Sequence, residues 1–132
     1  MAGQDASVIA RFDATGFRDG YGRVWLVDDN ISVTASAFAF ASDAGARQFL
    51  ELQRTEGQKQ FSPPSSVLAT SIPQSFGFVG LLAGQQPGAA VVFAYRHWTF
   101  EVSMTSPADQ LDVGRLRQLA MRQYDLVRTA SR

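Results

Sequence analysis

The alternation of bulky and small residues predicts a β-hairpin most clearly between positions 89 and 105. Residues 89–95 and 98–105 favour strands, and Arg96-His97 separates them. Counting outward from this turn puts bulky pairs on one face of the hairpin: Tyr95/Trp98, Phe93/Phe100, Val91/Val102 and Ala89/Met104. A loop of two or four residues gives this pairing. A three-residue loop would place the aromatic residues on opposite faces, so we exclude it.

The first half of the chain predicts a second hairpin, built from residues 23–27 and 31–41 around a polar turn. Within its second strand, the bulky residues change from odd positions, such as Ile31 and Val33, to the even positions Phe38 and Phe40. Either a β-bulge near residues 35–37 reverses the faces, or the far half of the strand is covered on both faces. The glycine-rich residues 16–23 are expected to form a turn-rich connection.

Two segments have the periodicity of amphipathic helices. Residues 43–56 follow a capping residue, Ser42 or Asp43, and place Ala46, Phe49 and Leu50 on one side. The C-terminal helix begins either around Ser106-Pro107 or at Asp112. Its apolar stripe consists of Leu116, Leu119, Ala120, Tyr124 and Val127. Residues 7–16 predict a short helix, with a strand as the alternative.

These elements together predict a single α+β domain over residues 1–132. The expected order is a short helix, two strands, a helix, three strands and a long helix. About five strands form an antiparallel sheet, and the two main helices cover one of its faces. Residues 76–82 supply the remaining strand. Residues 58–75, rich in proline and serine, are expected to form a long loop, and residues 1–6 are expected to be flexible.

Composition narrows the chemistry that this domain can perform. Twelve basic residues balance twelve acidic ones, which argues against a nucleic-acid-binding protein. The chain has no cysteine and one histidine, so thiol catalysis, cysteine-ligated metal sites and an all-histidine metal site within one chain are excluded, and no cofactor is expected. No apolar run is long enough to span a membrane, and no signal peptide opens the chain. Whether Met1 is the natural start stays open.

The candidate site residues are aromatic. Trp25, Tyr95, His97 and Trp98 would line a ligand pocket if the strands of the two tryptophans were neighbours. His97 has no acidic partner at a useful spacing, so no catalytic residue is assigned, and an enzyme is less expected than a binding protein. An enzyme or carrier of the α+β barrel type that binds haem or a small ligand is one alternative. A structural homodimer formed through an uncovered strip of Phe38 and Phe40 is another.

The stretches Phe38–Leu50 and Val91–Val102, followed by a terminal helix rich in Arg and Leu, resemble small α+β domains of exported actinobacterial proteins and lipoproteins. Such domains are often similar to the PsbP-like sandwich fold. The resemblance rests on core and cap residues, so it carries over no catalytic residue. It implies an extracytoplasmic, non-enzymatic module that binds a small ligand or a protein.

Overall fold

The computed structural model describes residues 16–27, 31–58, 61–67, 70–82, 86–107 and 111–130. It confirms an α+β domain built on an antiparallel sheet. The strands are β1 (Phe17–Val27), β2 (Ile31–Phe40), β3 (Phe61–Val67), β4 (Ser75–Leu82), β5 (Pro87–Tyr95) and β6 (Trp98–Thr105), and the helices are α2 (Asp43–Gln58) and α3 (Val113–Ala130). The expected flexible residues 1–6, and all but the last residue of the expected helix 7–16, lie outside the described residues.

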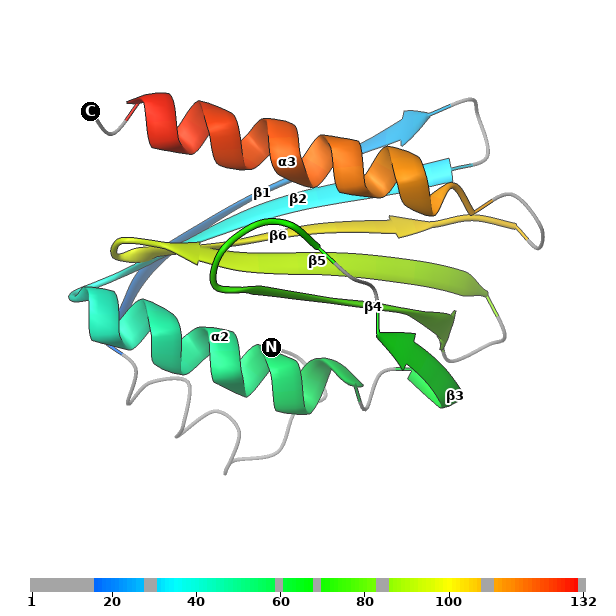
Figure 1. The fold of residues 1–132 in the computed structure, drawn as a ribbon, viewed down its shortest axis with the longest axis horizontal. Coiled ribbons are helices and arrows are strands. Elements are labelled where there is room, and N and C mark those ends of the chain that lie inside the picture. Colours follow the sequence, from blue (N-terminus) through cyan, green and yellow to red (C-terminus); the bar gives the residue numbers. More distant parts are fainter. Residues whose placement is uncertain are drawn as a thin grey trace.

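The sheet is a single antiparallel layer with the order β1-β2-β6-β5-β4-β3 (Figure 1). A two-residue turn joins β5 and β6, and Tyr95 pairs with Trp98, Phe93 with Phe100, Val91 with Val102 and Ala89 with Met104. The predicted register is therefore confirmed. Both faces of β5 are buried along most of the strand, whereas buried and partly buried residues alternate along most of β6.

The two helices pack on opposite faces of the sheet, so the prediction that both cover the same face is wrong. Leu116 and Ala120 of α3 pack in one cluster with the odd-numbered β5 residues, including Phe93. Leu50 of α2 packs with the even-numbered Val92. Because alternate residues of a strand point to opposite faces, the sheet lies between α2 and α3. Figure 1 shows the strands running between the two helices.

This arrangement explains why the bulky residues of β2 change from odd to even positions. The β2–β6 register is continuous from Ser32 to Ala39, so no bulge interrupts β2 near residues 35–37. Ile31 and Val33 belong to the cluster under α3, whereas Phe40 packs against Phe49 of α2. Ala37, in the far half of β2, also packs against the cluster under α3. The second explanation, in which the far half of the strand is covered on both faces, is therefore confirmed.

Two segments that were expected to be irregular are edge strands. Residues 61–67, within the expected loop 58–75, form β3, and a register shift separates its two pairings with β4 between Ser62 and Ser66. Pro63 and Pro64 fall in that gap, which an edge strand tolerates because its outer amides need no partner. Residues 17–22 extend β1, although they include Gly20 and Gly22. The sheet therefore has six strands instead of about five.

Local hydrogen bonds fix the start of each helix. Ser42 Oγ accepts the amide of Gly45 at 3.0 Å, which identifies Ser42 as the cap of α2. Asp112 Oδ1 accepts a hydrogen bond from the amide of Arg115 at 3.0 Å, so α3 begins at the later of its two expected starts.

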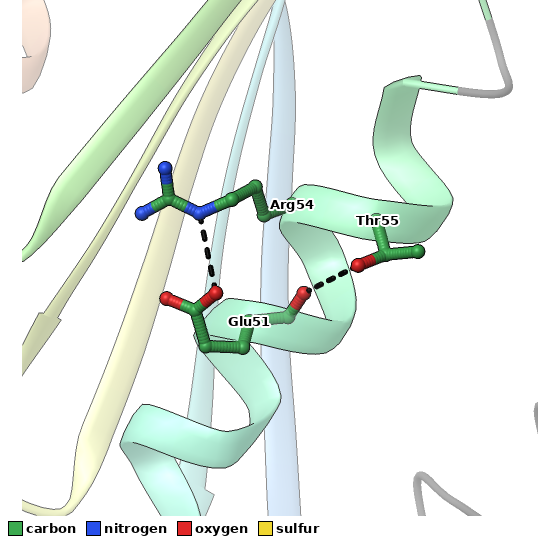
Figure 2. Close-up of polar contacts among 3 residues, drawn as sticks. All are labelled: Glu51, Arg54 and Thr55. Carbon is green, nitrogen blue, oxygen red and sulfur yellow. Dashed lines mark hydrogen bonds and ion pairs between the residues drawn. The ribbon is translucent and has the colours of Figure 1, made fainter.

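An ion pair lies on the outer side of α2, where Arg54 Nε is 3.3 Å from Glu51 Oε2 (Figure 2). The guanidinium also lies 5.1 Å from the centre of the Phe76 ring.

Candidate functional site

Tyr95 and Trp98 belong to a group of partly exposed aromatic side chains on the α3 side of the sheet. The Tyr124 ring of α3 meets Tyr95 edge to face, with ring centres 6.0 Å apart. The Trp98 ring stacks on Phe100 at 6.1 Å and lies 6.3 Å from Tyr21 of β1. We call Tyr21, Tyr95, Trp98 and Tyr124 the aromatic group. It brings together two of the predicted site residues and two that the sequence analysis did not select.

The strand order separates the backbone of Trp25 from that of Trp98. The predicted pocket required the strands of Trp25 and Trp98 to be neighbours, but β2 lies between them. The backbone of Trp25 pairs with Val33, whereas Trp98 pairs with Ala39. Six residues along β2 correspond to about 20 Å. The register therefore separates the two backbone positions along the strands as well as across the sheet.

His97 occupies the exposed turn between β5 and β6. Its backbone carbonyl accepts the amide of Phe40 at 2.8 Å, and its ring centre lies 5.9 Å from that of Trp98. The preceding residue, Arg96, has a positive φ of 55°, which is typical of a tight hairpin turn. Among the described residues, no ion pair involves the imidazole. His97 therefore lies at the margin of the aromatic group, and its main contact is made by its backbone.

Phe38 and Phe40 are part of the packing beneath α2. Phe40 is 1% exposed, and its ring centre lies 5.1 Å from that of Phe49. Phe38 is partly buried and also lies 5.1 Å from Phe49. The expectation of an uncovered aromatic strip is therefore wrong for Phe40, because α2 covers this end of β2. An interface built on Phe40 would require the helix to move away.

A hollow of about 170 Å³ lies beside the aromatic group, between β1 and α3. Ala35 and Ala37 form its floor because their small side chains leave space beneath the helix. Tyr21 and Arg23 of β1 and Gln123 of α3 line its sides. Tyr21 is 59% exposed and belongs both to the aromatic group and to the hollow.

Tyr21 lay within the expected connection 16–23, and Arg23 lay at its junction with the expected strand 23–27, so neither residue was a candidate for the site. Their alternation with Gly20 and Gly22 was the available signal, since alternate residues of a strand share one face. Glycines usually weaken strands, and this feature hid the pattern. Here the space over Gly20 is filled, because a side chain added there would lie 3.4 Å from the Phe17 ring and 3.5 Å from Phe38.

Charged groups surround the aromatic group. The Arg96 guanidinium lies 5.6 Å from the centre of the Tyr95 ring, and that of Arg128 lies 5.3 Å from the Tyr124 ring. Tyr21 Oη donates to Asp19 Oδ2 at 2.9 Å, and this hydrogen bond, together with the negative charge of Asp19, raises the pKa of the Tyr21 phenol. Cationic and hydrogen-bonding groups therefore border an apolar surface.

Glu101 of β6 also lines the hollow. Burial raises the pKa of Glu101, which pairs with Val92 and Ser36 on the central strands. Within the described ranges, His, Asp and Glu side chains form no group of three that could hold a metal ion. In the same residues, no helix is long and apolar enough to cross a membrane.

Comparison with known proteins identifies a similar fold. No model of a known protein family matches this chain, and no curated protein matches it. Its structure is similar to the extracellular domain of PknH from Mycobacterium tuberculosis, with a TM-score of 0.57 and 10% sequence identity. The match covers 83% of this chain and 65% of the PknH chain, so this chain spans just under two thirds of that domain. At this identity the likeness shows a shared fold alone.

Proposed function

We propose that this chain is a non-enzymatic binding module that works outside the cytoplasm. The fold that it shares with an extracellular domain of a mycobacterial protein supports the location. The hollow beside the aromatic group supports the binding role, and it is the observation that carries the proposal. The expected likeness to PsbP-like domains of exported proteins and lipoproteins agrees with both parts and stays a prediction. No contact among the described residues favours the haem carrier.

The lining of the hollow indicates the ligand class. Ala35, Ala37 and the Tyr21 ring offer apolar surface, while Arg23 and Gln123 offer a cation and an amide. Ser36 and Glu101 also line the hollow, and burial raises the pKa of the Glu101 carboxyl group, which disfavours its charged form. A small ligand with an aromatic or aliphatic body and one carboxylate matches this combination, because guanidinium groups bind carboxylates well. The apolar body would lie on the alanines and the carboxylate would face Arg23.

A fluorescence titration tests this binding role. In the variant Trp25→Phe, Trp98 is the remaining tryptophan, and its contact with Tyr21 makes its emission sensitive to the hollow. A panel of small aromatic carboxylates and their neutral amides would be titrated against this variant. We expect saturable changes with the carboxylates and weaker changes with the amides.

A matched pair of variants locates the binding. Ala37→Leu fills the floor of the hollow and should abolish the saturable signal. Gln118→Leu adds the same side chain on the outer side of α3 and should leave the signal unchanged. No saturable binding by any carboxylate, or equal binding by Ala37→Leu, would contradict the proposed site.

The location has its own test. The natural reading frame that contains this chain would be fused to a reporter enzyme that is active only after export. Reporter activity in intact cells is expected. A fusion that accumulates inside the cell without activity would contradict an extracytoplasmic module, whatever the ligand titration shows.

A further inference from the structure

The two edges of the sheet differ in how well they are protected against pairing with another strand. The edge strand β3 contains two adjacent prolines and an interruption between Ser62 and Ser66, which are both features that block strand addition. The other edge strand, β1, pairs with β2 without interruption from Asp19 to Val27. Residues 18–24 are all exposed. A long, regular edge of this kind is a ready template for another strand.

Two hydrogen bonds show which backbone groups of β1 face outward. The amide of Phe40 points toward β6, where it donates to His97, and the amide of Ala41 points toward β1, where it donates to Gly16. The direction of the backbone amide alternates from one residue of a strand to the next, so the backbone groups of Ala37 also point toward β1. Its partner Tyr21 therefore directs its own backbone amide and carbonyl toward β2. The backbone groups of Gly20 and Gly22 therefore point away from the sheet.

The Gly20 amide confirms this direction. It donates to Asp19 Oδ1 at 2.8 Å instead of to a backbone carbonyl of β2. Asp19 is thus the group that occupies the outer edge in the single chain. A partner strand could replace it if that strand brought both a backbone acceptor for Gly20 and a cation for the displaced carboxylate.

The sequence at this edge is complementary to itself. Residues 19–23 read Asp-Gly-Tyr-Gly-Arg, and Asp19, Tyr21 and Arg23 lie on the same face. In an antiparallel pair centred on Tyr21, Asp19 of each copy lies opposite Arg23 of the other. We propose that two copies of this chain associate through β1 in this register, which joins their sheets into one continuous sheet.

Each part of the motif has a role in this pairing. Gly20 of one copy and Gly22 of the other exchange amide–carbonyl hydrogen bonds on both sides of the centre, which takes up their outward backbone groups. The two Tyr21 residues form a pair without backbone hydrogen bonds, the type in which opposite side chains lie closest. The zero net charge of the chain minimises repulsion between the copies.

The charges select this register over its neighbours. Sliding one strand by two residues keeps the same side chains on the same face. In one direction the slide places Arg23 of one copy opposite Tyr21 of the other, and in the other direction it places Asp19 opposite Tyr21. Both ion pairs are then lost. Only the register centred on Tyr21 places a cation opposite Asp19 in exchange for the Gly20 amide.

Charge reversal tests the proposal without any ligand, so its outcome is independent of the proposed binding role. In a dimer of Asp19→Arg, the new arginine of each copy faces Arg23 of the other. In a dimer of Arg23→Asp, the new aspartate of each copy faces Asp19 of the other. In sedimentation velocity we expect wild type to shift from monomer to dimer as its concentration rises to roughly 1 mM. Each variant should raise the dimer dissociation constant at least about tenfold. Mixing the two variants should restore dimers, because each then meets opposite charges.

Controls separate strand pairing from general effects of charge or unfolding. Arg47→Asp makes the same charge change as Arg23→Asp, but at an exposed position of α2, and this variant should dimerise like wild type. Gly22→Pro removes an outward amide and should abolish dimers, whereas Gly22→Ala keeps that amide and should retain them. The added Cβ at position 22 lies 3.7 Å from Ser36 Oγ, an ordinary contact. Circular dichroism and thermal melting confirm that each variant is folded.

Several results would overturn the proposal. One is a wild-type protein that stays monomeric at 1 mM, in which case β1 could pair only with a strand from a different protein. Another is a dimer that persists in Gly22→Pro. A third is a mixture of Asp19→Arg and Arg23→Asp that forms no heterodimer although both variants are folded.

Discussion

Truncation of Phe40 distinguishes a core residue from an interface residue. Phe40 is 1% exposed, with ring centres 5.1 Å from Phe49 and 5.9 Å from Phe17. Phe40→Ala loses about 1.5–3 kcal/mol of apolar transfer free energy and about 0.5–1.5 kcal/mol for each aromatic contact. The expected loss of unfolding free energy is therefore about 3–5 kcal/mol, the usual range for buried Phe→Ala substitutions. Typical domains have about 5–15 kcal/mol in total.

Urea denaturation at several protein concentrations measures this loss. The shift of the midpoint should be the same at every concentration, because the contacts lie within one chain. Leu26→Ala, at a position on β1 that is 67% exposed, is the control and should change stability by less than about 0.5 kcal/mol. A loss below about 1 kcal/mol in Phe40→Ala, or a loss that grows with protein concentration, would refute the packing of α2 over this strand.

Substitutions at three other positions test single features of the fold. Thr99→Val removes the buried hydrogen bond from Thr99 Oγ1 to the Ala46 carbonyl (3.0 Å) and should cost about 0.5–1.5 kcal/mol in urea titrations; no loss would mean that this bond does not tie α2 to β6. Asp112→Ala removes the cap of α3 and should cost about 1 kcal/mol by thermal denaturation, whereas Asp112→Asn should retain most of it. Burial raises the pKa of Glu101 above its ordinary 4.5, so wild-type stability falls as pH rises from that value through the raised pKa. Glu101→Gln should therefore be more stable than wild type at pH 7, and the difference should vanish near pH 4; equal stability at both pH values would contradict the burial.

Much of the fold could be predicted because local residue patterns determine it. The turn between Tyr95 and Trp98 determined the β5–β6 register, since only a loop with an even number of residues puts the aromatic residues on one face. Capping residues likewise located both helices. The face on which each helix packs depends on contacts distant in sequence. Only the change from Val33 to Phe38 hinted that both faces of β2 are covered.

The parts that escaped prediction lie at the two edges of the sheet. Glycines in β1 and prolines in β3 are poor strand residues in isolation, but an edge strand needs partners on one side only. The same error removed Tyr21 and Arg23 from the candidate site. Tyr95 and Trp98 were selected correctly as neighbours of each other, whereas Trp25 depended on a strand order that the local pattern could not supply.

The pairing of β2 with β6 also sets the order in which the chain can fold. Strands β3, β4 and β5 each pair with the next strand in sequence, so their contacts can form as soon as each hairpin is complete. The β1–β2 hairpin reaches the sheet only through β6, and Ser32 must find Thr105 across most of the chain. Closing so long a loop is slow. During synthesis the N-terminal hairpin must wait for β6 to emerge, and until then both edges of that hairpin are open to pairing with other chains.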